Sequence, residues 1–163
     1  MGLDKIRSSL KEPIKTDDLQ LVRSLCNILT CLIDPAKGFK GDQKQKDMDC
    51  LFAFAYTYGL GAALEEKSKD YFDSTVREIF KVAAYPSGFT VFDYFYDLKK
   101  SKTWMTWDER VPQFVYNKEK AFFDLMVETS STFRHAWCLE LLLDGSYPVF
   151  FTGESGVGKS VII

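Results

Sequence analysis

A glycine-rich octapeptide near residue 160 places the strongest constraint on this chain. Its letters, Gly-Glu-Ser-Gly-Val-Gly-Lys-Ser, satisfy the pattern G-x-x-x-x-G-K-[ST]. The apolar run Val149–Thr152 precedes it, and Ser160–Ile163 could open a helix. A strand, a glycine loop and a helix start in this order predict a phosphate-binding loop rather than a plain Gly/Ser turn. The candidate nucleotide-binding residues are Gly153, Glu154, Ser155, Gly156, Val157, Gly158, Lys159 and Ser160.

The chemistry of phosphate binding explains why these residue types occur in this order. The three glycines allow positive φ and close backbone approach, so that successive N–H groups can face one concavity. Lys159 would place its charge on the outer phosphates, and Ser160 would offer its hydroxyl to Mg²⁺. Glu154 would repel phosphate, so we expect it to point to solvent. The pattern predicts a site for ATP or ADP with Mg²⁺.

Phosphoryl transfer needs further groups that this motif does not supply. These are an acidic residue for the metal, a group that orients the attacking water and usually an arginine. All of them would lie beyond Ile163, and the strand Val149–Thr152 by itself would have two unpaired edges. We therefore expect a truncated α/β core, no catalytic residue within the chain and no ATP hydrolysis by it alone.

Composition places the chain among ordinary globular proteins. It has 163 residues, of which 46% are hydrophobic and 27% charged, with a net charge of −2 and a sequence pI of about 5.5. This charge predicts binding to neither nucleic acid nor an anionic membrane, and Lys37–Lys46 is interpreted as a solvated loop. No apolar run approaches the roughly 18 residues of a membrane helix, and the first 15 residues do not resemble a signal peptide. We expect an intracellular protein.

The cysteines and the histidine give no sign of a metal or catalytic centre. Four cysteines show no C-x-x-C spacing, and His135 is the only histidine. A zinc site is therefore not expected, and reduced buried thiols are the default interpretation. His135 falls in a helical pattern without a nucleophile motif nearby, which favours a surface or core role over catalysis.

Three amphipathic helices are predicted in the first half of the chain. The first follows Thr16 as N-cap and ends near Asp34-Pro35. The second carries glycines at 59 and 61, which suggest close contact with another backbone, and the third runs from near Ser68 to the turn at residues 85–88. The inward-facing residues are expected to be, in turn, Leu19, Val22, Cys26, Leu29 and Ile33; Met48, Leu51, Phe52, Ala55, Tyr58, Gly59 and Ala62; and Phe72, Val76, Ile79, Phe80 and Ala83.

The pattern then changes from helical to extended. Thr90–Asp97 alternates in period two and predicts a strand with Thr90, Phe92, Tyr94 and Tyr96 on one face. An irregular or hairpin segment around Trp104 and Trp107 follows, and then a short extended piece at 114–116. Base stacking on these aromatics is less favoured than a packed core, because no basic surround accompanies them. One more helix is expected at Ser131–Leu143, closed by Asp144-Gly145.

The expected fold is therefore mainly α with minor β, in three parts. Residues 1–86 form a three-helix unit, residues 87–128 an aromatic connector that contains β structure, and residues 129–163 the first strand and phosphate loop of a truncated α/β P-loop NTPase core.

Several short pieces occur in a specific order that ends at the octapeptide. They are Leu25-Cys26; Phe52-Ala53-Phe54 and Tyr58-Gly59; Phe72-Asp73 and Arg77-Glu78; residues 90–94; Trp104, Trp107, Val111-Pro112 and Phe114; and residues 147–153. This order resembles a dynein heavy chain, in the stretch of its AAA+ ring that leads from the helical lid of the second module into the nucleotide-binding core of the third. The likeness extends from about Thr16 onward, and the octapeptide is more similar to that of axonemal heavy chains than to that of the cytoplasmic form.

The resemblance implies a part of an ATP-driven microtubule motor located in the cytoskeleton of cilia or flagella. Its partners would be the rest of the dynein ring and the dynein complex subunits, with microtubules reached only through the full-length motor. Residues 1–86 would be the AAA+ lid, and Gly153, Gly158, Lys159 and Ser160 would contact phosphates and Mg²⁺. Residues 127–134 would lie near the adenine, where Glu128 and Ser131 replace the family's usual proline and aspartate. At Tyr58, tryptophan is common in the family.

Two other interpretations remain open from the sequence. In one, the chain is a non-enzymatic helical interaction module whose phosphate loop is a relic. In the other, it is an independent small nucleotide kinase or GTPase, which is disfavoured because those proteins carry this loop near their start. Since dynein heavy chains run to thousands of residues, a fragment, a partial gene model or a truncated isoform is expected.

Overall fold

A computed structural model of the chain describes residues 10–35, 39–41, 43–116, 118–119, 125, 127–153, 155–156 and 158–162. Within these residues helices dominate, with one small sheet, so the prediction of a mainly α fold with minor β is confirmed. The elements are α2 (Asp18–Leu32), α3 (Gln45–Gly61), α4 (Glu66–Ile79), the 3-10 turns η2 (Lys81–Ala83) and η3 (Val91–Asp93), β1 (Tyr94–Asp97), β2 (Thr103–Thr106), the 3-10 turn η4 (Trp107–Glu109), α5 (Ser130–Asp144) and α6 (Lys159–Ile162).

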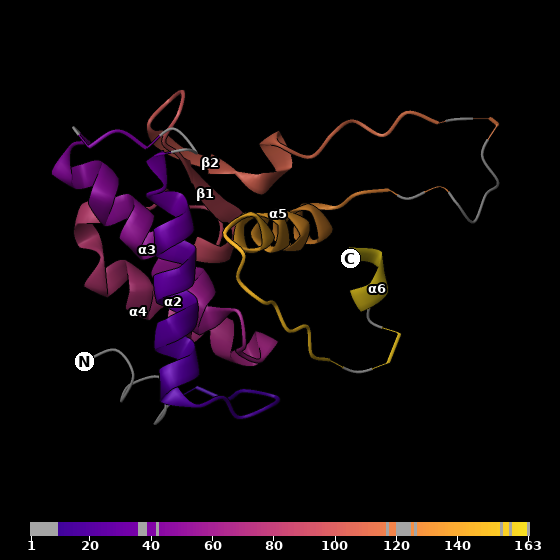
Figure 1. The fold of residues 1–163 in the computed structure, drawn as a ribbon, viewed down its shortest axis with the longest axis horizontal. Helices are drawn as coiled ribbons and strands as arrows, with labels where there is room; N and C mark the ends of the chain where they lie inside the picture. Colours follow the sequence, from indigo (N-terminus) through magenta and orange to yellow (C-terminus); the bar gives the residue numbers. More distant parts are fainter. Residues whose placement is uncertain are drawn as a thin grey trace.

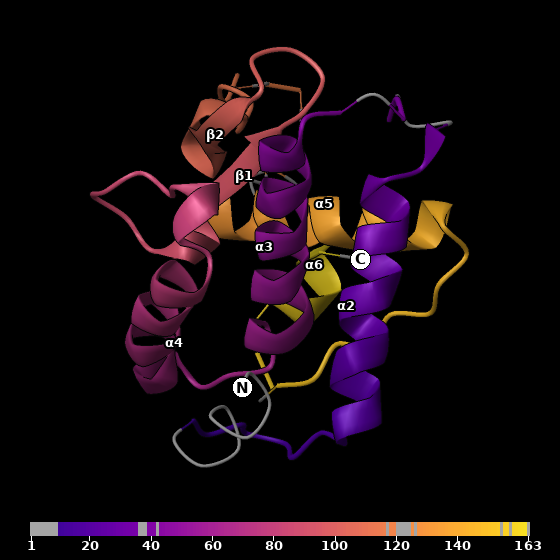
Figure 2. The same cartoon turned by 90° about the vertical axis from the view of Figure 1, so that its left-hand side faces the viewer.

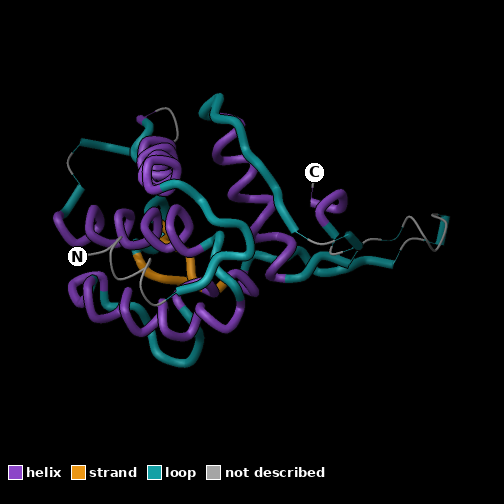
Figure 3. The backbone as a smooth tube through the Cα atoms, turned by 90° about the horizontal axis from the view of Figure 1, so that it is seen from below, coloured by secondary structure: helices purple, strands orange, loops and turns teal. Residues whose placement is uncertain are grey.

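Helix α3 is the centre of the molecule. It lies between α2 and α4, and the β1–β2 hairpin packs at one end of this three-helix layer (Figures 1 and 2). Helix α5 crosses the layer, in contact with α2 and with η4. In the view from below, the segments that lead to and from α5 extend to one side of the helical body (Figure 3).

Helix α2 forms where it was predicted, but with a different cap and a different buried face. Asp17, not Thr16, is the N-cap, and its side chain and that of Gln20 form a reciprocal capping box. Leu19 is 64% exposed and Val22 42% exposed, and Cys26 is exposed as well, so the predicted inward stripe is wrong at these positions. The residues of α2 that are buried instead are Leu21, Ile28 and Cys31.

A contact with α3 explains why α2 buries a different face from the predicted one. A Cβ added at Gly59 would lie 2.5 Å from the Cα of Leu25, so the two helix backbones meet at this point. This contact turns the face that contains Leu25, and with it Leu21 and Ile28, toward α3. Since α2 carries apolar residues on two stripes, its sequence alone does not decide between them. The expected close backbone contact is confirmed for Gly59, whereas Gly61 approaches the rings of Phe72 and Phe92.

Helix α3 is buried on nearly all sides rather than along one stripe. Its buried residues run without interruption from Ala53 to Gly61, while Phe52 is 40% exposed and Ala62 is exposed. A helix that is apolar all round fits a central position between other elements. Two hydrophobic clusters meet on it, one shared with the hairpin and α5 and one shared with α4 and η3.

The guanidinium of Arg77 holds helix α4 to the turn that follows it. Arg77 Nε donates to both carboxylate oxygens of Asp73, and the rest of its guanidinium donates to the carbonyls of Tyr85, Pro86 and Phe89. The predicted inward residues Phe72, Val76 and Ala83 are buried, but Ile79 is 42% exposed because the helix ends there.

The predicted strand at 90–97 forms only in its second half. Thr90 and Asp93 instead make a capping box around η3, and β1 begins at Tyr94. It pairs antiparallel with β2 in the register Tyr94↔Thr106 to Asp97↔Thr103. Three successive β1 residues, from Tyr94 to Tyr96, are buried, so both faces of the short strand are covered and no polar face develops.

The connection from the hairpin to α5 lacks regular secondary structure in its described residues. Phe114, Val115 and Tyr116 are 48%, 82% and 62% exposed, and the extended piece expected there makes no strand pairing. Helix α5 matches its prediction closely, with Thr129 as N-cap and Gly145 as C-cap. In the described part of the chain, no helix combines the length and apolarity that a membrane span requires.

Candidate functional site

The phosphate-loop motif adopts a glycine-dependent bend that ends in a helix. Gly156 and Gly158 have φ values of 81° and 85°, which other residues rarely adopt. Among the described residues, no atom lies within 4 Å of the position where a Cβ would stand on either glycine. Glu154 and Val157 fall outside the described residues, and the expectation that Glu154 points to solvent stays a prediction.

Lys159 closes the loop on itself. Its Nζ donates a hydrogen bond to the carbonyl oxygen of Gly153 at 2.9 Å, across the six residues of the bend. Lys159 is also the first residue of α6, and Ser160 follows it in the same turn with an exposed side chain. The structure therefore brings together the ammonium, the hydroxyl and the glycines that the motif singled out.

The strand predicted before the loop does not form. Residues 147–153 have no regular secondary structure, and the side chain of Phe150 is 87% exposed. The N–H and C=O groups of an isolated strand have no neighbouring strand to bond, so no inter-strand hydrogen bonds stabilise its extended conformation. The described part of the chain offers only the β1–β2 pair, which lies in a different part of the molecule.

Helix α5 connects this loop to the three-helix body through a network that sequence reasoning missed. Arg134 Nη1 donates to the carbonyl oxygen of Phe92 at 2.9 Å, and the Tyr58 hydroxyl donates to the same oxygen at 2.7 Å. Trp107 Nε1 donates to the Tyr58 oxygen at 2.8 Å. The one available signal was Tyr58 itself, because a hydroxyl on a helix that is apolar all round needs a buried partner.

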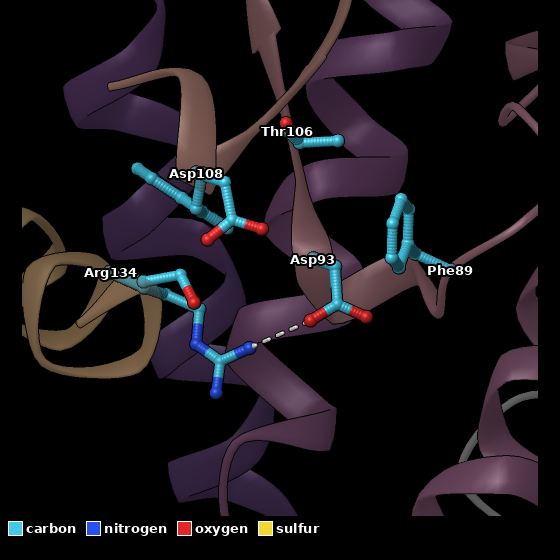
Figure 4. Close-up of a pocket in the computed structure, with 7 residues that line it drawn as sticks. Phe89, Asp93, Thr106, Asp108 and Arg134 are labelled. Carbon is cyan, nitrogen blue, oxygen red and sulfur yellow. Dashed lines mark ion pairs between the residues drawn. The ribbon is translucent and has the colours of Figure 1, made fainter. Parts of the chain in front are cut away.

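A cavity of about 200 Å³ lies where η3, η4 and the start of α5 meet (Figure 4). This volume is below the roughly 300–1,000 Å³ of common ligand pockets, so the cavity is too small for a whole nucleotide. Its lining residues are Phe89, Asp93, Thr106, Trp107, Asp108, Ser130 and Arg134.

The carboxylates in and beside this cavity differ in the hydrogen bonds and ion pairs that they make. Asp93 accepts from the backbone and hydroxyl of Thr90, and its Oδ1 lies 3.8 Å from Arg134 Nη1. Glu109 accepts from the backbone and hydroxyl of Thr106, and these hydrogen bonds lower its pKa. Asp108 has no hydrogen bond or ion pair within the described residues.

Burial shifts the pKa values of one histidine and two cysteines. Burial lowers the pKa of His135, whose Nδ1 lies 2.6 Å from the carbonyl oxygen of Ser131. Burial raises the pKa of Cys50 to about 11 and that of Cys138 to about 12, so both thiols stay protonated at neutral pH. Among the described residues, no group of three or more His, Cys, Asp or Glu side chains could hold a metal ion.

Comparison with known proteins divides the chain into two matched regions. Residues 1–109 match the model of the dynein heavy chain AAA lid domain, and residues 114–163 match that of the P-loop containing dynein motor region. Among curated relatives, the chain is 30% identical over 165 residues to dynein axonemal heavy chain 11 of Sus scrofa. It is 32% identical over 165 residues to the ciliary dynein beta chain of Tripneustes gratilla and 32% over 168 residues to dynein axonemal heavy chain 6 of Homo sapiens. Each alignment covers 99% of this chain but about 4% of the relative.

Proposed function

This chain belongs to the dynein heavy chain family, and we propose that its residues 153–160 bind the phosphates of ATP or ADP together with Mg²⁺. The observation that carries the proposal is the bend itself. Gly156 and Gly158 hold positive φ and meet no described atom at their Cβ positions, and a phosphate-binding loop needs such glycines so that the backbone can approach the phosphate closely. A Cβ at either position would obstruct that approach.

Each side chain of the loop has a role in this proposal. Lys159 exchanges its bond to the Gly153 carbonyl for the outer phosphates, and the Ser160 hydroxyl becomes a ligand of Mg²⁺. The metal, when bound, neutralises charge on the phosphates. The backbone N–H groups between Gly153 and Gly158 hold the phosphate oxygens without a side chain in the way.

The wider role follows from the relatives. The relatives described above are named axonemal or ciliary, and the chain spans about 4% of their length. We assign the segment to an ATP-driven motor ring that acts on microtubules in cilia or flagella, alongside the rest of the ring and the other dynein subunits. Residues 1–86 would supply the lid of the second module, 87–128 the connector and 129–163 the start of the third module's core. We expect nucleotide binding without hydrolysis from these 163 residues alone.

Titration with a fluorescent ATP analogue and Mg²⁺ tests the proposal. We expect saturable binding by the chain, weakened about 10- to 100-fold by Lys159→Ala, which removes a charge-assisted contact to phosphate. Lys67→Ala, on the exposed surface of α4, is the matched control and should bind as the unchanged chain does. Equal binding by both variants would reject the assignment.

A relic loop on a helical interaction module is the second candidate. The observation that favours it is the exposed apolar surface of α2, where Leu19 is 64% exposed and Val22 is 42% exposed. Absence of any saturable nucleotide binding in the same titration would support this alternative. Retained binding that depends on Lys159 would exclude it.

A further inference from the structure

We infer that the turn of the β1–β2 hairpin is a latch, which the charge of Lys102 holds closed over the thiol of Cys50. This turn, residues 98–102, lies beside the start of α3 (Figure 2). The inference goes beyond the proposed nucleotide site and does not depend on it, because no residue of the latch belongs to the phosphate loop.

The latch rests on a buried carboxylate in the first turn of α3. Asp47 is 4% exposed, and its Oδ1 accepts a hydrogen bond from the Tyr96 hydroxyl at 2.5 Å. Its Oδ2 is buried and has no hydrogen-bond partner among the described residues. The ammonium of Lys102 lies 3.7 Å from that Oδ2. A carboxylate removed from water needs a cation close by, and Lys102 supplies it.

Other charged groups near this pair do not replace Lys102. Lys44 and Lys46 flank Asp47 in the sequence, but both are exposed, and the ion pair of Asp47 in the structure is with Lys102. Asp97, the carboxylate of the hairpin turn, accepts hydrogen bonds from the backbone and hydroxyl of Ser101 within the turn itself. The charge of Lys102 is therefore directed at Asp47.

Lys102 joins the turn to α3 under strain. Its Nζ donates to Gln43 Oε1 at 3.1 Å, and its carbonyl oxygen lies 3.0 Å from the Tyr96 hydroxyl. Its φ is 50°, a left-handed conformation that is unfavourable for a residue with a Cβ and that persists only where surrounding contacts hold it. Since the Lys102 side chain is 50% exposed, these contacts lie at the surface, and their loss would let the turn relax.

Cys50 lies beneath the hairpin, one helical turn after Asp47. It is 0% exposed, and its Sγ lies 3.5 Å from the carbonyl oxygen of Ala83. Trp104 Nε1 donates to the same carbonyl oxygen at 2.7 Å, and the Tyr96 hydroxyl lies beside the thiol. Two hairpin residues therefore cover Cys50, and displacement of the turn next to Tyr96 gives a small reagent access to it.

Loss of the Lys102 charge favours opening of the turn over unfolding of the chain. Without this charge, the buried carboxylate of Asp47 must regain water. Asp47 is fixed within α3, which is buried along most of its length, whereas the turn lies at the surface. The hairpin beyond the turn stays anchored by Trp107, which is 1% exposed. The turn is therefore the part that moves.

Alkylation by iodoacetamide, resolved by peptide mass spectrometry, tests the latch in the 163-residue chain. Because a covered thiol reacts only while it is exposed, its rate reports the population of the opened state. We expect Lys102→Gln to raise the rate at Cys50 about 10- to 100-fold, since it leaves a buried carboxylate without its partner. Lys102→Arg, which keeps the charge, should raise it less than about threefold.

Three controls separate charge, local opening and unfolding. Lys100→Gln removes the same charge from an exposed side chain of the same turn and should leave the rate at Cys50 unchanged. Cys31, which is 3% exposed on α2 beside Gly145, reports unfolding of the whole chain and should react equally slowly in every variant. Adding Asp47→Asn to Lys102→Gln removes the buried charge and should return the rate at Cys50 to within about threefold of that in the unchanged chain.

Four outcomes would overturn the inference. The first is equal rates at Cys50 in Lys102→Gln and Lys100→Gln, and the second is an equal rise in Lys102→Gln and Lys102→Arg. The third is a parallel rise at Cys50 and Cys31, which would show unfolding of the chain rather than opening of the turn. The fourth is a double variant that stays as reactive as Lys102→Gln. Binding of the fluorescent ATP analogue should be the same in Lys102→Gln as in the unchanged chain, so failure of the latch and failure of the phosphate loop are separate results.

Discussion

The lid region with α5 and the segment that follows α5 differ most clearly in the burial of Trp107 and Phe150. Trp107, in the lid region (residues 1–109), is 1% exposed, and its ring lies 5.1 Å from that of Phe95 and 5.4 Å from that of Trp137 on α5. Phe150, in the P-loop region (residues 114–163), is 87% exposed on a segment without regular secondary structure. The lid region and α5 therefore share one aromatic core, whereas the segment after α5 exposes an apolar side chain that further strands of an α/β core would cover.

The difference also shows in hydrogen bonding. In the lid region, the buried Tyr58 hydroxyl is bonded to Phe92 and Trp107, whereas the buried Tyr56 hydroxyl has no hydrogen-bond partner among the described residues. Around the phosphate loop, a side-chain hydrogen bond joins Lys159 to the carbonyl oxygen of Gly153. We conclude that the lid region, together with α5, carries the stability of this chain, and that the loop depends on it for attachment.

The largest effect is expected from emptying the aromatic core. Trp107→Ala removes a fully buried ring and one of the partners of the Tyr58 hydroxyl, and it should lower the free energy of unfolding by about 3–5 kcal/mol. Phe150→Ala, the same class of truncation in the other region, should change it by less than about 0.5 kcal/mol. Urea unfolding followed by circular dichroism measures both. Similar losses for the two variants would contradict the difference in burial between Trp107 and Phe150.

Sequence patterns predicted a helix best where contacts with neighbouring elements did not decide its ends or its buried face. The period and ends of α5 followed from its own residues, since Thr129 and Gly145 are strong cap types. The buried face of α2 did not, because two apolar stripes were available and contact with Gly59 selected between them. Thr90 was predicted as a strand residue, but its side chain caps η3 instead.

In the candidate site, too, the sequence predicted features that depend on local residues and missed features that depend on packing. The glycines and Lys159 were predicted from the sequence motif alone, because positive φ and a fixed charge are local requirements. The strand before the loop was predicted from its apolar composition, which does not supply the ladder partner that a strand needs. The cavity next to Arg134 was not predicted, since Asp93, Asp108 and Arg134 come together only through the packing of η3 and η4 on α5.

An intermediate effect is expected from adding one methyl group to the α2–α3 contact. Gly59→Ala would place a Cβ 2.5 Å from the Leu25 Cα, and the two helices would have to separate. We expect a loss of about 1–3 kcal/mol in the free energy of unfolding. Gly41→Ala is the matched control, because no atom lies within 4 Å of the added Cβ there. An unchanged midpoint for Gly59→Ala would contradict the close helix contact that sets the rotation of α2.

The smallest effect is expected from pH, at the helix that joins the two regions. Burial lowers the pKa of His135 from its ordinary value of 6.5, and the nearby charges of Arg134 and Lys69 act in the same direction. The unfolded chain therefore takes up a proton at this ring before the folded chain does, and stability should fall as the pH drops below about 6.5. Lowered carboxylate pKa values, such as that of Glu109, act only at more acidic pH.

Unfolding midpoints measured between pH 8 and pH 5 test this expectation, with His135→Gln as the variant that should remove the slope. Because His135 lies on α5 beside Arg134, its protonation adds a charge next to the network that attaches α5 to Phe92. Local opening of α5, measured by hydrogen exchange of its amides, should therefore depend on pH more strongly than local opening of α3. If stability rises as the pH falls, or if hydrogen exchange in α3 depends on pH as strongly as in α5, the titrating group lies elsewhere in the molecule. Either result would argue against α5 as the element that connects the lid to the phosphate loop.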